Sequence, residues 1–462
     1  MRTWSPLIAV CLGTFLLLVD VTVVVVALPA IDADLGAGFA GLQWVLDGYA
    51  LALATLLLGA GSLADRYGRR RAYLVGLGLF AASSLLCALA PDERVLVAAR
   101  VLQGVGGAAM FATTVALLHV SYHGRDRGVA FGVWGAVNGA AAAAGPVVGG
   151  LLTEHAGWRW IFLVNLPICL LAAWLTVRTV AESRAGAGRF DVPGTAAFTV
   201  AAGATTYGLV RAGDAGWTDG VTLGAFALGL LAVVVFVVVE RRRAYPMLDL
   251  ALFRRPSFTA LVVAALLAQA AAFAYLPFTT VWLQQVLGHG PVDAGLLGAL
   301  PMSAAALVVG AVAGERLQRW SPRWTVGIGL VLVAVGDLLQ STVGADSGGA
   351  VLVPGLVVAG LGVGAVLPTL SSAVLASVPP ERSGMAGGAL NTARQLGFAL
   401  GVAVFGGVFR STVDQGFADG LGTTLTVAAG VAAFGAVLAL VFVRRPAPAS
   451  SPRASRVPSG VS

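Results

Sequence analysis

Charge is scarce in this sequence, and one charged residue type is missing altogether. Only 11% of the 462 residues are charged, whereas 58% are hydrophobic, and the mean hydropathy is +0.88. A soluble domain normally carries about a quarter charged residues. A chain of this length with less than half that fraction cannot stay in water. The composition therefore predicts an all-α integral membrane protein with most of its mass in the bilayer.

Lysine is the missing type, and all 29 basic residues are arginine. Its absence excludes a Walker-type phosphate loop and Schiff-base chemistry, because both need a lysine amine. A membrane-embedded enzyme would need clustered Asp and Glu for a metal, or a Ser/His/Asp group near an interface. The sequence offers neither, so we expect no catalytic residue and no cofactor.

Cysteine and histidine are equally sparse. The three cysteines stand in apolar runs and are odd in number, which indicates buried small hydrophobes without disulfides. The four histidines stand at unrelated spacings that form no metal pattern. These seven residues are Cys11, Cys87, Cys169, His119, His123, His155 and His289.

Long apolar runs make up most of the chain. A spanning helix needs about 20 apolar residues, and the runs between turn and charge signals give fourteen candidates. They are residues 6–29, 43–63, 71–90, 95–120, 129–152, 158–178, 192–211, 220–240, 257–284, 293–313, 324–343, 350–372, 384–409 and 420–443.

Arginine placement predicts the orientation of these spans. With the N-terminus inside, 23 arginines fall in inside segments, four in outside loops and two, Arg100 and Arg394, within spans. Because arginine gathers in cytoplasmic loops, both termini should be cytoplasmic. The net charge of +7 then reflects topology rather than binding to nucleic acid. We expect a monomer in the cell membrane, with the lipid bilayer as its environment.

The chain is expected to divide into two helix bundles. Residues 1–180 would form a six-helix bundle, 181–245 a cytoplasmic linker with two inserted helices, 246–443 a second six-helix bundle, and 444–462 a disordered tail. Two patterns recur in both halves, at nearly equal offsets: Gly61, Arg66 and Arg70 with Gly314, Arg319 and Arg323, and Gly104 and Gly106 with Gly360 and Gly362. Repeated halves are typical of alternating-access transporters. The sequence contains no ATPase domain, so active transport would draw on an ion gradient.

Several motifs, in order, resemble those of the major facilitator superfamily, and in particular its fourteen-helix drug:proton antiporter branch. They lie at residues 18–29, 61–71, 100–107, 145–150, 158–167 and 383–397. The resemblance implies two six-helix bundles plus two extra spans. It also implies export of amphipathic drugs or antibiotics in exchange for protons. The alternatives are a dedicated exporter of one endogenous metabolite, such as a self-made antibiotic, or, further away, a membrane-embedded enzyme or a channel. One departure is Val25, where the pattern usually has asparagine.

Three charged residues are candidates for proton coupling and substrate binding. A carboxylate within an apolar helix costs about 2.5–3.5 kcal/mol on insertion scales, so Asp20 should face the interior with a partner or a proton. At 1.5 Å per residue, Asp20, Asp47 and Arg100 all fall in the outer half of the membrane and could converge. The alternatives are a static Asp20–Arg100 pair and an Asp47 that is solvated or hydrogen-bonded within its helix.

Two further motifs concern conformational change. Gly61 and Gly68 permit a tight turn, and Asp65 could pair with Arg66 or Arg69 or face a helix N-terminus. The resemblance implies a cytoplasmic latch, although the arginines could serve only to fix orientation.

The second motif is the helix that contains Gly145, Pro146, Gly149 and Gly150. The proline should kink this helix, and the glycines should pack tightly. The resemblance implies the antiporter signature, against the alternative of an ordinary Ala/Gly-rich helix.

The second half holds two charges within its spans, Arg394 and Asp337. Arg394 could stabilise the interface between the halves or contact substrate. For Asp337 we expect a local hydrogen-bonded role. Phe273, Tyr275 and Phe278 either line a lipophilic pocket or pack in the core.

Overall fold

The computed structural model describes residues 4–184, 191–243, 246–378 and 383–443, and the regular structure in these ranges is all helical. The predicted tail, 444–462, lies outside the described residues. The N-terminal helices are α1 (Ser5–Leu35), α2 (Gly38–Tyr67), α3 (Arg69–Ala88), α4 (Glu93–Ser121), α5 (Gly124–His155), α6 (Trp160–Leu163) and α7 (Asn165–Thr179). Two helices follow, α8 (Val192–Ala215) and α9 (Gly220–Arg242).

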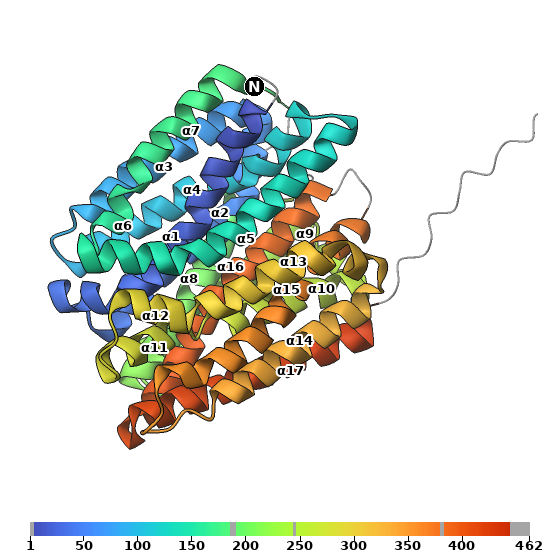
Figure 1. Ribbon diagram of the computed structural model, residues 1–462. Helices are drawn as coiled ribbons and strands as arrows, with labels where there is room; N and C mark the ends of the chain where they lie inside the picture. Colours follow the sequence, from blue (N-terminus) through green and yellow to red (C-terminus); the bar gives the residue numbers. More distant parts are fainter. Residues whose placement is uncertain (1–3, 185–190, 244–245, 379–382, 444–462) are drawn as a thin grey trace, which may run out of the picture.

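The C-terminal helices begin after a short turn, η1 (Leu250–Arg254). They are α10 (Pro256–Phe273), α11 (Leu276–Val281), η2 (Trp282–Val286), α12 (Pro291–Gly298), α13 (Leu300–Arg319), α14 (Pro322–Gln340), η3 (Gly349–Val351), α15 (Leu352–Ala376), α16 (Ser383–Thr412), η5 (Val413–Gln415) and α17 (Phe417–Phe442). Figure 1 shows α1–α7, the N-terminal half, packed beside α10–α17, the C-terminal half.

Eleven of the described helices are long and apolar enough to cross a membrane, and the pair α12–α13, bent by 43°, could make a twelfth. The chain is therefore a multi-pass membrane protein. Each of the fourteen predicted ranges falls on a helix or helix pair. Helix α8 does not reach the same hydropathy, because it is rich in Ala, Gly and Thr. The three cysteines are buried and free, as expected.

Helices α8 and α9 pack against each other, and α8 also contacts α2 and α16, one helix from each half. Arg211 on α8 donates to Asp219 in the following loop at 2.8 Å. This hydrogen bond lowers the pKa of Asp219, which also accepts from the Thr222 backbone N–H at the start of α9. The pair ties the ends of the two helices together.

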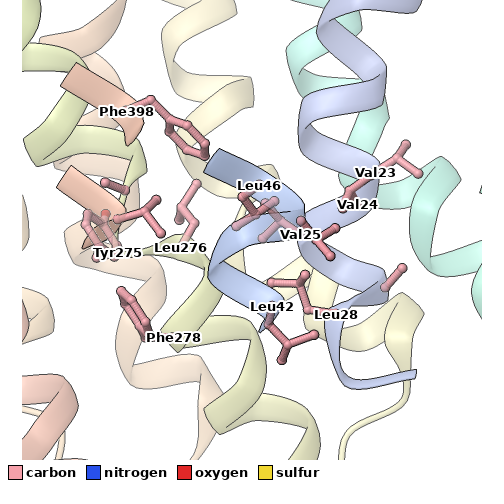
Figure 2. Close-up of a cluster of buried hydrophobic side chains, with 14 of the residues drawn as sticks. Val23, Val24, Val25, Leu28, Leu42, Leu46, Tyr275, Leu276, Phe278 and Phe398 are labelled. Carbon is pink, nitrogen blue, oxygen red and sulfur yellow. The ribbon is translucent and has the colours of Figure 1, made fainter. Parts of the chain in front are cut away.

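The apolar core joins the two halves at one end of the molecule. One cluster includes Ile31, Leu42 and Phe162 from the N-terminal half and Leu283 and Phe409 from the C-terminal half. Figure 2 shows side chains of α1 and α2 turned toward those of α11 and α16 within this cluster. At the opposite end the core is split into two clusters, one in each half. We call the end where the halves share a core the joined end.

The recurring glycine patterns occupy matching contacts in the two halves. A Cβ atom at Gly106 would lie 2.8 Å from the backbone N of Phe80 on α3, and one at Gly362 would lie 3.0 Å from the backbone N of Val333 on α14. Gly76 and Gly329 meet the carbonyl oxygens of Gly106 and Gly362 in the same way. The internal repeat predicted from these glycines is therefore present in three dimensions.

These contacts generate a stability prediction. Gly362→Ala would place a methyl group against the α14 backbone, and we expect it to destabilise the protein by about 1–3 kcal/mol, as overpacking does. Gly430→Ala on α17 is the matched control, because a Cβ atom there meets nothing within 4 Å and alanine favours the helix. Thermal unfolding in detergent, followed by tryptophan fluorescence, measures both. Equal melting temperatures would contradict the contact.

Candidate functional site

A buried ion pair lies in the N-terminal half. Asp20 on α1 accepts from an Nη atom of Arg100 on α4 at 2.5 Å, and both side chains are 1% exposed. The second carboxylate oxygen of Asp20 accepts from Gln103 at 3.0 Å and from Asn165 at 3.1 Å. Ser84 on α3 accepts from the same two amides, at 2.9 and 3.4 Å. Four helices thus meet at one carboxylate.

The Arg100 guanidinium is held on several sides. Its Nε donates to the Val45 carbonyl at 3.0 Å, and its Nη atom also donates to Gln103 at 2.6 Å. The guanidinium carbon lies 4.4 Å from the centroid of the Tyr49 ring and 5.9 Å from that of Phe162. A buried ion pair is stable only when such additional contacts offset its desolvation.

The predicted pairing of Asp20 with Arg100 is therefore present, but Asp47 does not join it. Asp47 on α2 is fully buried, and neither carboxylate oxygen has a hydrogen-bond partner among the described residues. Tyr49 covers Arg100, and side chains two residues apart on a helix point in nearly opposite directions. The carboxyl group of Asp47 consequently faces away from the ion pair.

Helical spacing shows what Asp47 faces instead. Gln43, one turn earlier on α2, donates to the Val402 carbonyl on α16 at 2.8 Å. Two turns beyond Asp47, the Ala54 carbonyl accepts from Thr392 on α16 at 3.1 Å. Residues at these spacings share one helix face, so Asp47 lies on the face of α2 that meets α16, between the two halves.

Aromatic and amide side chains close the joined end. The rings of Phe39, Phe278 and Phe409 stack in pairs at centroid distances of 5.5–5.6 Å. The guanidinium of Arg410 lies 5.1 Å from the Phe39 ring centroid, and Gln284 donates to the Val26 carbonyl at 2.8 Å. These five side chains make direct contacts across the halves.

The central part of the same interface is apolar. Val25 stands with Leu42 and Leu46 opposite Leu276 and Phe398 (Figure 2). The valine that replaces the usual asparagine thus adds to a hydrophobic seam. Tyr275 and Phe278 are buried in this cluster, and Phe273 packs against it, so these three residues form core rather than the walls of a pocket.

The predicted latch forms a compact corner between α2 and α3. Gly68 has a φ of +119°, which favours glycine. Asp65 pairs with Arg69 at 2.7 Å, within its own loop. Glu182, after α7, accepts from the backbone N–H groups of Arg70 and Arg71 at 3.1 and 3.2 Å. The helix N-terminus is thus capped by Glu182, a residue that the sequence analysis did not select.

The other two members of the latch motif make weaker contacts. The guanidinium of Arg66 lies 5.2 Å from the ring centroid of Tyr67. Gly61 faces Ala112 on α4, where an added Cβ atom would make ordinary van der Waals contact at 3.9 Å. Both of these contacts lie within the N-terminal half.

Helix α5 runs unbroken through Pro146 and packs on both halves. Gly145 and Gly149 face α1, where a Cβ atom at Gly149 would lie 3.0 Å from the Val23 backbone. Gly150 faces the start of α12, where a Cβ atom would lie 2.7 Å from the Pro291 carbonyl oxygen. The Pro146 carbonyl oxygen lies against Gly295 of α12 in the same way.

Arg394 on α16 bonds to a neighbouring helix of the C-terminal half. Its Nε donates to Gln269 on α10 at 3.4 Å. The polar partners of the predicted charges, namely Gln103, Asn165, Ser84 and Gln269, were not selected from the sequence as site residues. Gln103, Asn165 and Gln269 are polar residues within apolar runs, and Ser84 follows Ser83 in another; a polar residue in an apolar run is the signal that the sequence offers.

Comparison with known proteins places this site in context. The model of the Major Facilitator Superfamily matches residues 10–402 and, in an overlapping match, 261–461. The Tetracenomycin C resistance and export protein of Streptomyces glaucescens is 37% identical over 420 residues, which are 90% of this chain and 78% of that protein. The Multidrug resistance protein Stp of Mycobacterium tuberculosis is 38% identical over 404 residues, 87% of this chain and 75% of that protein.

Solved structures share the fold at low sequence identity. An auto inhibited POT family peptide transporter superposes with a TM-score of 0.72 at 14% identity, covering 97% of this chain and 98% of that chain. The human organic anion transporter MFSD10 (TETRAN) gives a TM-score of 0.68 at 16% identity, covering 95% and 99%. At such identities the likeness concerns the fold alone.

The buried ion pair generates a stability prediction. We expect Asp20→Asn and Arg100→Gln each to destabilise the protein by about 3–5 kcal/mol, because each breaks a buried pair. The double variant should lose clearly less than the sum, since no uncompensated charge remains. Thermal unfolding of the four proteins in detergent measures the cycle. Strict additivity would show that the two side chains do not interact.

Proposed function

This chain belongs to the Major Facilitator Superfamily, and we propose that it exports amphipathic drugs or antibiotics in exchange for protons, by alternating access. The observation that carries the proposal is the Asp20 carboxylate, buried in a membrane helix and held by Arg100 and two amides. A charge at such a site is expensive and marks a proton or substrate path. Relatives named for export and resistance support the direction of transport.

We further propose the fourteen-span arrangement with both termini in the cytoplasm. The support is that all fourteen predicted ranges fall on helices and that arginine is concentrated in alternate loops. In this orientation the joined end faces outward, and residues 1–180 and 246–443 would be the two moving bundles. The protein would act as a monomer and would need no cofactor beyond the proton gradient.

The proposed coupling uses the ionic state of Asp20. With the outer end closed, Asp20 is ion-paired with Arg100, which corresponds to the deprotonated form. A proton that reaches Asp20 from outside would neutralise the carboxylate and leave Arg100 with the Gln103 and Val45 oxygens alone. The contacts that fix α1 to α4 would then weaken. Asp47, between the halves, is placed to titrate or to attract a cationic substrate as they separate.

Two other segments would control the conformational cycle. The Asp65–Arg69 corner, capped by Glu182, lies at the end of the molecule where the cores are split. It would latch that end when the halves meet there. The α5 glycines would let α1 and α12 lie against α5 without side chains between the backbones.

A dedicated exporter of one endogenous antibiotic is the alternative that the relatives also favour. The Cephamycin export protein CmcT of Amycolatopsis lactamdurans is 37% identical over 408 residues, which are 87% of this chain. Both functions would use the same coupling residues, so the two differ only in the range of compounds that drive proton flux.

Proton flux in proteoliposomes tests the coupling. Vesicles with an imposed pH gradient receive lipophilic cations, neutral antibiotics and anionic compounds in turn. We expect substrate-triggered proton movement that Asp20→Asn abolishes and Asp47→Asn reduces, because both carboxyls lie buried along the path. Asp346→Asn, an exposed loop carboxylate, is the control and should match the parent. Unchanged flux in Asp20→Asn would move coupling away from this residue.

Access to the outer end tests the alternating-access part. Gly150→Val would push a side chain against the α12 backbone, which disfavours the closed arrangement. We expect a cysteine introduced at Leu42, 8% exposed at the joined end, to react faster with a membrane-impermeant maleimide in the Gly150→Val background. The native cysteines are buried and give a low background. Gly430→Ala should leave the rate unchanged. A slower or equal rate in Gly150→Val would rule out this role for α5.

A further inference from the structure

A second carboxyl group is buried in the C-terminal half, apart from the ion pair. Asp337 lies near the end of α14, is fully buried, and has no hydrogen-bond partner for either oxygen among the described residues. The local hydrogen-bonded role expected from the sequence stays a prediction. The hydroxyl of Tyr275 is the polar group beside the carboxyl. Gln340, three residues on, donates to that hydroxyl at 3.1 Å.

The internal repeat shows which position Asp337 occupies. Gly76 and Phe80 on α3 make the same contacts as Gly329 and Val333 on α14. Continuing one more turn, the counterpart of Ser84 is Asp337. Ser84 belongs to the Asp20–Arg100 network, so the C-terminal half has an acid where the N-terminal half has a hydroxyl.

The cation of that network has no counterpart in the C-terminal half. Gly104 and Gly106 on α4 match Gly360 and Gly362 on α15, so the positions that match Arg100 and Gln103 are Leu356 and Ala359. Both are fully buried hydrophobic residues.

The helices packed against α14 supply no cation to Asp337 either. These helices are α15, α17 and α10. Helices α10 and α15 contain no titratable residue, and the only charge on α17 is the exposed Asp419 in its first turn. Arg323 lies at the opposite end of α14. Without a cation, a carboxyl at this depth is stable in its protonated form.

Tyr275 connects this acid to the interface between the halves. It stands at the break between α10 and α11, next to Leu276, and Figure 2 shows both side chains in the cluster that faces α1 and α2. The buried Tyr275 hydroxyl accepts from Gln340 on α14, so water would reach this hydroxyl only when the halves separate at the joined end. Closure would seal the acid again.

We propose that Asp337 is a second proton-carrying group, which exchanges its proton with the central interface through the Tyr275 hydroxyl. In the release step the Tyr275 hydroxyl gives its proton to water and takes the proton of the Asp337 carboxylic acid, leaving a carboxylate and a hydronium ion. Uptake is the reverse. The proposal rests on the proposed antiport, in which it would add one proton site to Asp20.

Infrared spectroscopy of the purified protein tests this assignment without any substrate. A protonated buried acid gives a carbonyl stretch above the amide I band. We expect a component of this band that is lost in Asp337→Asn and in Asp337→Ser, which installs the hydroxyl found at the matching position 84. Using two variants guards against one that fails to fold. A spectrum that neither variant changes would show that Asp337 is ionised and would overturn the proposal.

Hydrogen–deuterium exchange of that band tests the path. In D2O the Asp337 band should shift as water reaches Tyr275, and Tyr275→Phe should slow the shift by at least tenfold while leaving the band in place. Phe273→Leu, which removes an aromatic ring without a hydroxyl, is the control. A band that never shifts would identify a sealed structural acid and overturn proton exchange. A shift that Tyr275→Phe leaves unchanged would overturn the route. Neither measurement depends on antiport, so failure here is distinct from failure of the proposed function.

Discussion

A carboxylate inside a bilayer must find either a cation or a proton, and this requirement organises the molecule. In the N-terminal half Asp20 meets it with Arg100, and the two groups make further hydrogen bonds to residues of α2, α4 and α7. Ser84 on α3 accepts from the two amides that donate to Asp20. Helices that share one buried charge in this way cannot move independently, because separating them would leave that charge buried without a partner, which is costly in free energy. The ion pair therefore ties these helices of the N-terminal half to one another.

The two halves differ in how a buried carboxyl group is accommodated. Their helix contacts repeat closely, down to glycines that meet the neighbouring backbone at matching positions. Their chemistry does not repeat, since Arg100 and Gln103 are matched by Leu356 and Ala359. The two halves thus share one helix arrangement, but the positions that hold a cation and an amide in the N-terminal half hold hydrophobic residues in the C-terminal half. The repeat preserves the packing of the helices, whereas the buried polar groups differ between the two halves.

The fold and the Asp20–Arg100 pair can be predicted from the sequence because both follow from the physical demands of the bilayer. Apolar run length located the helices, and depth along the helix placed Asp20 beside Arg100. The position of Asp47 cannot be predicted from depth alone, because depth along a helix does not give direction around it. Its spacing places Asp47 on the same helix face as Gln43, but that this face meets α16 is set by tertiary packing. Glu182 could not be found at all, because it caps a helix more than a hundred residues away.

The contact between α5 and α12 has a mechanical consequence. Where Gly150 meets Pro291 and Gly295 meets Pro146, backbone lies directly on backbone, and Glu154 on α5 accepts from the Val292 backbone N–H of α12. At these two points the contact surfaces are smooth, because neither glycine has a side chain to insert between side chains of the other helix. Rotation or sliding there requires no rotamer to change, so the work of moving one half against the other is concentrated at the aromatic stack and the amide contacts of the joined end.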